Sequence, residues 1–94
     1  GLLKPIYRWI PSIAVSDMTF YKGDQFPELK DNIILTSLKA GRLISLEFSN
    51  GKASNETILV QGMGRLRDVE QNDEGDLFVI IDDDVSGIYK LTRN

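Results

Sequence analysis

The sequence predicts an all-β fold, and three observations lead to this prediction. Its strand-forming runs are short and are separated by turn dipeptides such as Asn50-Gly51. No segment carries a sustained apolar pattern with the helical period of 3.6 residues. The arrangement of strands and turns also recurs once along the 94 residues. The chain is therefore expected to form two similar units of antiparallel sheet.

The composition fits one small globular unit and excludes several classes of function. Hydrophobic residues make up 41% of the chain and charged residues 27%, which are ordinary globular values. Eleven basic against 14 acidic residues give a net charge of −3, which argues against a nucleic-acid partner. No apolar run is long enough to predict a membrane span. Without Cys or His, the chain holds no disulfide, thiolate nucleophile or imidazole base.

The first unit is expected to contain four strands, at about residues 12–22, 32–39, 42–49 and 55–61. The dipeptide Asn50-Gly51 predicts a type I′ hairpin, because both residues tolerate positive φ. The segment 26–30 contains a proline and lacks an apolar period, so we expect a loop there rather than a helix.

The second unit is expected to contain three strands, at about residues 65–72, 76–82 and 87–92. The apolar residues Phe20, Leu46, Phe48 and Phe78 are expected in the core between the two sheets. The acidic run Asp82 to Asp84 is expected to be the solvated tip of a turn rather than a calcium site, and no metal ligand is predicted.

An internal repeat indicates the architecture. Asn32 and Asp76 begin similar segments 44 positions apart, and Gly41 and Gly87 lie 46 positions apart. A period in the mid-forties filled with hairpins is typical of propeller blades. We therefore expect a leading segment at 1–11, a four-stranded blade at 12–62 and a blade lacking its outer strand at 63–94. A small β-sandwich built from the same hairpins is the alternative.

The chain begins at Gly1 without Met, which is interpreted as a tag remnant before a segment that starts within a longer protein. Two blades cut from a ring would expose apolar flanks and an open strand edge. Self-association is therefore expected.

Three cations are expected at one end of these blades. In a propeller, the turn carrying Lys39 and the connection carrying Arg65 and Arg67 open on the same end. Residues i and i+2 of a strand share a face, so the two arginines should point one way and Asp68 the other.

The aromatic residues Tyr7 and Trp9 precede the first strand and open on that end too. Guanidinium groups, an ammonium and aromatic rings together suit a flat ligand with several negative charges. A solvated face or a salt bridge between blades is the alternative interpretation of the arginines.

Four ordered segments resemble a known family. They are residues 10–16, 20–27, 35–41 and 64–69, and the last contains Gly64-Arg65-Leu66-Arg67-Asp68-Val69. Over about residues 5–92 the chain resembles the C-terminal end of the soluble pyrroloquinoline-quinone-dependent sugar dehydrogenases. This is the glucose/sorbosone dehydrogenase group, which includes the aldose sugar dehydrogenases.

The resemblance implies the last two blades of a six-bladed propeller, with the quinone at the channel mouth. It assigns cofactor contacts to Lys39, Arg65 and Arg67, and substrate contacts to Tyr7 and Trp9. Some members carry an aromatic residue directly before the proline, where this chain has Ile10 with Trp9 one step earlier.

The family's histidine base and its calcium ligands belong to earlier blades, so no catalytic residue is predicted in this chain. The parent protein would oxidise an aldose to a lactone in a bacterial periplasm or outside the cell, and the isolated chain would be inactive. The alternative is a non-catalytic propeller that binds a protein or a glycan.

Overall fold

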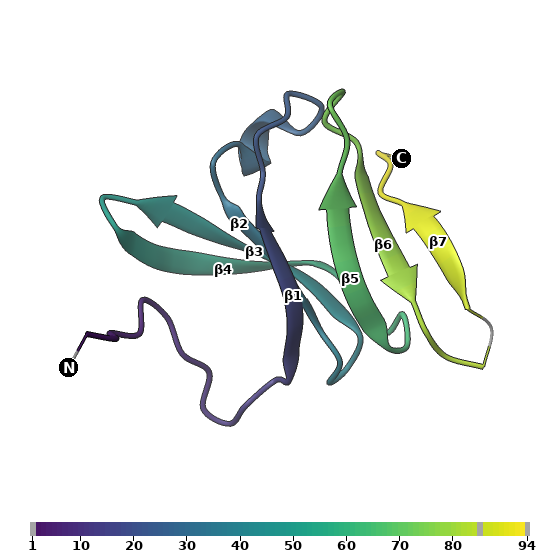
Figure 1. Ribbon diagram of the computed structural model, residues 1–94, viewed down its shortest axis with the longest axis horizontal. Helices are drawn as coiled ribbons and strands as arrows, with labels where there is room; N and C mark the ends of the chain where they lie inside the picture. The colour runs from purple at the N-terminus through teal and green to yellow at the C-terminus, as the bar shows by residue number, and fades with distance from the viewer. Residues whose placement is uncertain (1, 85, 94) are drawn as a thin grey trace.

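The computed structural model describes residues 2–84 and 86–93, which form two antiparallel sheets (Figure 1). Gly1 and Asn94, at the outer bounds of the expected leading segment and second blade, lie outside the described residues. The first sheet contains β1 (Val15–Phe20), β2 (Ile33–Ser37), β3 (Arg42–Ser49) and β4 (Lys52–Val60). The second contains β5 (Leu66–Gln71), β6 (Leu77–Ile81) and β7 (Gly87–Lys90).

Each strand pairs with the strand that follows it in the chain, so both sheets are meanders. The predicted all-β class and strand order are confirmed. The fourth strand begins at Lys52 rather than at residue 55, because Lys52 pairs with Ser49 directly across the tight turn. At that turn φ is +53° at Asn50 and +74° at Gly51, as the type I′ prediction requires.

The segment 26–30 departs from the expected irregular loop. Pro27–Leu29 form one turn of 3₁₀ helix, η1, with the proline at its start. The side chain of Leu29 is buried in the core, which holds this turn against the sheets. A single 3₁₀ turn needs no apolar period, so the sequence carried no helical signal for it.

A bulge at the same place in each sheet interrupts the alternation of side chains. The bulge in β1 lies between Val15 and Asp17, and the bulge in β5 lies between Leu66 and Asp68. Because of the extra residue, Leu66 and Val69 both face the core although they are three positions apart. The strict alternation assumed for Arg65, Arg67 and Asp68 is therefore interrupted at the bulge, and Arg67 and Asp68 are both exposed.

The main core lies between the two sheets, where β1 and β5 run side by side (Figure 1). Buried apolar residues from both sheets form it, among them Ile34, Leu43, Leu66, Val69, Leu77 and Val79.

Four residues expected in that core are not part of it, namely Phe20, Leu46, Phe48 and Phe78. Phe20 and Phe48 form an edge-to-face pair on the far side of the first sheet, with ring centroids 5.4 Å apart. Leu46 is buried on this same far side, and Phe78 is only half-buried. Tertiary packing, rather than hydrophobicity, decides which face of a strand becomes the core.

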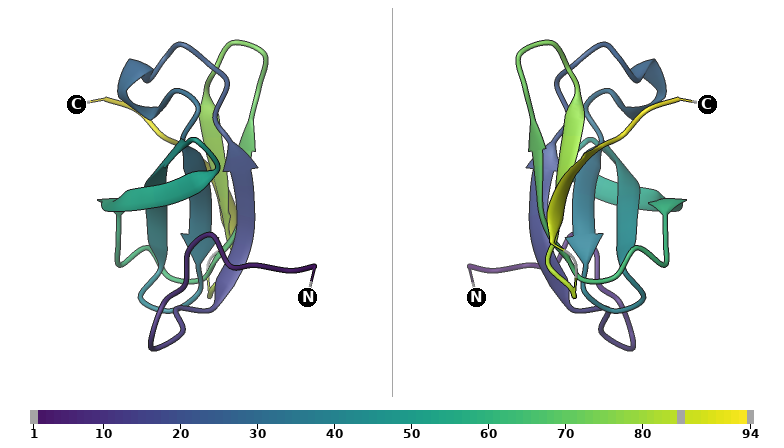
Figure 2. Two further views of the ribbon diagram at one scale, coloured as in Figure 1. Left: turned by 90° about the vertical axis from the view of Figure 1, so that its left-hand side faces the viewer. Right: turned by 90° about the vertical axis from the view of Figure 1, so that its right-hand side faces the viewer.

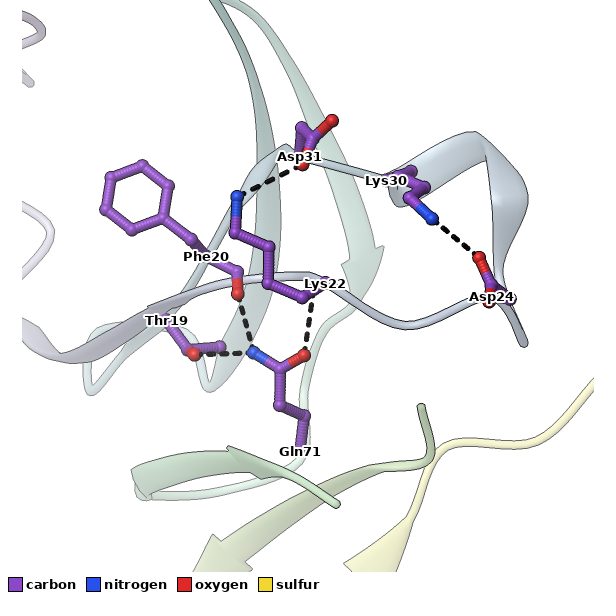
Figure 3. A network of polar contacts seen from close by, with 7 residues as sticks. All are labelled: Thr19, Phe20, Lys22, Asp24, Lys30, Asp31 and Gln71. Carbon is purple, nitrogen blue, oxygen red and sulfur yellow. Dashed lines mark hydrogen bonds and ion pairs between the residues drawn. The ribbon is translucent and has the colours of Figure 1, made fainter. Parts of the chain in front are cut away.

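The side chain of Gln71 on β5 joins the end of β1 to the second sheet through hydrogen bonds (Figure 3). Its amide nitrogen donates to Thr19 Oγ1 at 2.9 Å and to the carbonyl oxygen of Phe20 at 2.6 Å. Its carbonyl oxygen accepts from the backbone N–H of Lys22 at 2.9 Å. One side chain thus satisfies three polar groups across the boundary between the sheets.

The loop after β1 returns to the second sheet through Tyr21. The buried Tyr21 hydroxyl donates to the carbonyl oxygen of Gly75 at 2.6 Å and accepts from the Phe26 backbone N–H at 3.2 Å. Two exposed ion pairs, Lys22–Asp31 at 3.1 Å and Lys30–Asp24 at 2.7 Å, lie along the same loop (Figure 3). Exposed ion pairs of this kind contribute little stability. The buried hydroxyl of Tyr21 therefore does more to hold this loop against the second sheet.

The two ends of the described chain lie at opposite ends of the sheets (Figures 1 and 2). The leading segment lies at the end that carries the β2–β3 turn, and Arg93 lies at the other, where it pairs with Glu28 at 2.6 Å. Within the residues that the structure describes, no helix is long and apolar enough to cross a membrane.

Candidate functional site

The β2–β3 turn and the β4–β5 connection are joined by their backbones. The N–H of Gly62 donates to the carbonyl oxygen of Ala40 at 2.9 Å, and the N–H of Met63 donates to that of Gly41 at 3.4 Å. Gly41 has φ +52°, and a Cβ added there would lie 2.2 Å from the carbonyl oxygen of Gly64. Only glycine allows this approach, which brings the Lys39 turn against the connection that leads to Arg65.

The β6–β7 turn completes this end of the molecule. The N–H of Asp82 donates to the carbonyl oxygen of Arg65 at 2.9 Å. Arg67, in the β5 bulge, places its Nε 3.6 Å from Asp82 Oδ2, and both side chains are about half exposed. This pair lies within the second sheet rather than between blades. It is solvent-screened and leaves guanidinium donors for another acceptor.

Lys39 borders a hollow that the leading segment closes on one side. Trp9 and Pro11 line it from the leading segment, and Lys39 and Arg42 line it from the β2–β3 turn and the start of β3. Its volume is about 340 Å³. The Arg42 Nε is buried and has no hydrogen-bond partner among the described residues. A buried donor without a partner is costly, so the guanidinium group of Arg42 favours an acceptor.

Tyr7 and Trp9 converge on Glu56 of β4. The Tyr7 hydroxyl donates to Glu56 Oε1 at 3.3 Å, and the Trp9 indole N–H donates to the same oxygen at 2.5 Å. The two rings meet edge to face with centroids 4.9 Å apart. Burial raises the pKa of Tyr7, and the charge of Glu56 and its hydrogen bond raise this pKa further. Both rings also cover the far side of the first sheet.

The structure thus brings some of the predicted site residues together. Lys39 and Trp9 share the hollow, and Arg65 and Arg67 lie on the adjoining connection and strand. Tyr7 lies with Glu56 instead, on the outermost strand of the sheet.

Sequence reasoning missed Arg42 and Glu56. Arg42 directly follows the Lys39-Ala40-Gly41 turn, so its proximity to Lys39 was a usable signal. Glu56 is separated from Tyr7 by 49 positions and gave no local signal.

The cations at this end of the sheets can bind anions. Lys39 and Arg42 supply an ammonium and a guanidinium group at the hollow that Trp9 also lines, and Arg65 and Arg67 add two guanidinium groups on the adjoining β4–β5 connection and β5, where Arg67 pairs with Asp82. Arginine pairs in bidentate fashion with carboxylates, and lysine acts as a mobile point charge. Among residues 2–84 and 86–93, no three acidic side chains gather in a cluster that would suit a metal ion.

A family model described as "Glucose / Sorbosone dehydrogenase" matches residues 1–90. The aldose sugar dehydrogenase YliI of Escherichia coli (strain K12) is 29% identical over 93 residues, which cover 98% of this chain and 25% of that protein. An uncharacterized protein of Synechocystis sp. is 31% identical over 91 residues, which cover 96% of this chain and 22% of that protein.

Solved structures agree with these sequence matches. A crystal structure of a glucose dehydrogenase superposes with a TM-score of 0.89 at 27% identity, over 100% of this chain and 28% of that chain. The two sheets therefore match blades of a propeller-like dehydrogenase rather than a β-sandwich. The chain spans about a quarter of the length of the curated relatives that it matches.

Proposed function

The chain belongs to the glucose/sorbosone dehydrogenase family, and we propose that it holds the anionic cofactor in a quinone-dependent aldose dehydrogenase. The proposal concerns a longer protein, because the chain covers about a quarter of its relatives. The cofactor is pyrroloquinoline quinone, a flat ring system with several carboxylates. When bound, it supplies the electron acceptor for oxidation of the sugar.

The observation that supports this proposal best is the junction between the Lys39 turn and the Arg65 connection. Two backbone hydrogen bonds and the close approach of Gly41 to Gly64 fix the two segments together. Cations held on rigid, adjoining turns recognise a multiply charged ligand without a large ordering cost. Lys39, Arg65 and Arg67 are the residues that we assign to the cofactor.

The residues present fit such a group. Arg42, whose buried Nε has no hydrogen-bond partner among the described residues, lines the hollow that Lys39 borders, and its guanidinium group suits a carboxylate. The ring of Trp9 offers an apolar surface beside these charges. We also propose that Trp9 and Tyr7 contact the aldose, since sugar rings pack on aromatic faces.

The chemical step needs groups that this chain does not supply. The chain has no histidine, so an imidazole base for the sugar hydroxyl must come from outside these 94 residues. We place the calcium ligands there too, and we assign the protein to the bacterial periplasm. The role of the described residues is to bind and orient the anionic cofactor.

The proposal is tested by titrating the chain with pyrroloquinoline quinone and following the fluorescence of Trp9, the one tryptophan present. Lys39→Ala, Arg65→Ala and Arg67→Ala each remove a charge-assisted hydrogen bond, so each should weaken binding about tenfold or more. Lys52→Ala, in the β3–β4 hairpin, and Arg93→Ala, at the opposite end of the sheets, are the matched controls.

Equal affinity in all five variants would contradict the cofactor role. Binding of glycans or peptides without any quinone dependence would instead support a non-catalytic binding propeller.

A further inference from the structure

A buried serine ends the strand that leads into the Lys39 turn. Ser37 is the last residue of β2, two positions before Lys39, and it is 0% exposed. A buried hydroxyl needs hydrogen-bond partners inside the protein, because water does not reach it. The partners of the Ser37 hydroxyl therefore show what this side chain does for the turn.

The hydroxyl of Ser37 lies between two backbone carbonyl groups. Its Oγ is 3.0 Å from the carbonyl oxygen of Lys39, and it is also within hydrogen-bond distance of the carbonyl oxygen of Ile13. A serine hydroxyl carries one proton, so the two carbonyl groups share a single donor. Ile13 and Lys39 both line the hollow. Ser37 thus joins two chain segments that form the wall of the hollow.

Backbone hydrogen bonds connect the same two segments. The N–H of Leu38 donates to the carbonyl oxygen of Ala14 at 2.9 Å, and the N–H of Lys39 donates to that of Ile13 at 3.3 Å. The second bond is long, so it restrains the backbone of Lys39 only weakly. The buried hydroxyl of Ser37 adds a contact to this same residue.

Each carbonyl group that Ser37 contacts precedes a strained alanine. Ile13 is followed by Ala14, where φ is +55°, and Lys39 is followed by Ala40, where φ is +63°. Alanine disfavours this left-handed conformation, which persists only where surrounding contacts hold it. Loss of the Ser37 hydroxyl would therefore allow the backbone on both sides of it to relax.

We propose that Ser37 is a positioning residue, which fixes the backbone of Lys39 and so holds its ammonium group at the hollow for the anionic cofactor. This inference rests on the proposed role of Lys39 in cofactor binding. Ser37 is fully buried, so it acts through Lys39 rather than on the ligand. A lysine side chain is long and flexible. A fixed backbone at its base limits the positions that the charge can reach.

Hydrogen exchange followed by NMR tests the first step without any ligand. Ser37→Ala should speed exchange of the Lys39 amide about fivefold, because a restraint on this backbone is lost. Ser45→Ala is the matched control. Ser45 is 2% exposed in the same sheet, and its Oγ accepts from Asn32 Nδ2 at 3.1 Å, at the opposite end of β2. This control also removes a buried hydroxyl, and it should leave exchange at Lys39 unchanged.

Titration with pyrroloquinoline quinone tests the second step. Ser37→Ala should weaken binding about fivefold, and Ser45→Ala should not weaken it. The double variant Ser37→Ala/Lys39→Ala should bind as weakly as Lys39→Ala alone, because Ser37 acts through the ammonium group that is already lost. A serine with a merely structural role would lower the affinity by the same factor in both backgrounds.

Circular dichroism shows whether each variant keeps its β-sheet structure. If Ser37→Ala does not, Ser37→Cys and Ser45→Cys take the place of the two alanine variants, since a thiol is only a weak donor. Unchanged exchange at Lys39 in the Ser37 variant would overturn the inference, and so would equal losses of affinity in the two backgrounds. Unchanged affinity in Lys39→Ala itself would contradict the proposed function, and the ligand step of this inference would fail with it.

Discussion

Replacing Gly41 by alanine should damage both the fold and the candidate site. Gly41 has φ +52°, a left-handed conformation in which an alanine costs about 1–2 kcal/mol. Its added Cβ would also lie 2.2 Å from the Gly64 carbonyl oxygen and 2.7 Å from the Gly64 nitrogen. Both neighbours are backbone atoms, so the β4–β5 connection must move, at a further cost of about 1–3 kcal/mol.

Gly51→Ala separates these two costs. Gly51 has φ +74°, and nothing lies within 4 Å of an added Cβ. This variant therefore carries the conformational cost alone, about 1–2 kcal/mol. Urea unfolding of both variants measures the difference. With a slope of about 1–2 kcal/mol per molar urea, the midpoint for Gly41→Ala should lie about 1 M below that for Gly51→Ala.

Quinone binding provides a second measurement of the effect of Gly41→Ala. Moving the connection away from the turn separates Arg65 from Lys39, so quinone binding should weaken in Gly41→Ala and not in Gly51→Ala. Equal unfolding midpoints for the two variants would refute the reasoning, because they would show that the approach of Gly41 to Gly64 is relaxed without cost.

Two further predictions concern the leading segment and the activity of the chain. The pKa of Tyr7 is raised above 10.0, so its contribution to stability is complete below pH 10 and is lost as the pH rises through the higher folded-state value. Glu56→Gln removes part of the cause, so NMR titration should give a lower Tyr7 midpoint in that variant, and an unchanged midpoint would leave burial as the sole cause. Without a histidine, the 94-residue chain should not oxidise glucose in a dye-linked assay with added quinone and calcium, and turnover above a protein-free control would disprove this.

Local backbone rules made most of the fold predictable from the sequence. The positive φ values of Asn50 and Gly51 and the pairing of neighbouring strands depend on residues close together in the chain. The repeat was also visible, although its alignment at Gly41 and Gly87 was wrong. Register pairs Ser37 with Arg42 and Ile81 with Gly87, so the counterpart of Gly87 is Arg42. The second turn is one residue longer than the first.

Long-range packing set the features that sequence reasoning missed. The bulges change which side chains share a face, and their one local signal was the spacing of three between Leu66 and Val69. Blade geometry predicted that the Lys39 turn lies next to the connection carrying Arg65. The contact of Glu56 with the leading segment depends on the tertiary packing of β4 and had no local signal in the sequence.

The two equivalent bulges share an aspartate but differ in the residue that precedes it. Asp17 and Asp68 are identical, and Asp17 accepts a backbone N–H of the neighbouring sheet. Ser16 and Arg67 occupy the residue before each aspartate, and they differ in chemistry. Ser16 is short and donates to the Leu66 carbonyl, whereas Arg67 extends to Asp82 and keeps donors in solvent. We therefore expect Arg67→Ala to weaken quinone binding and Asp68→Ala to leave it unchanged.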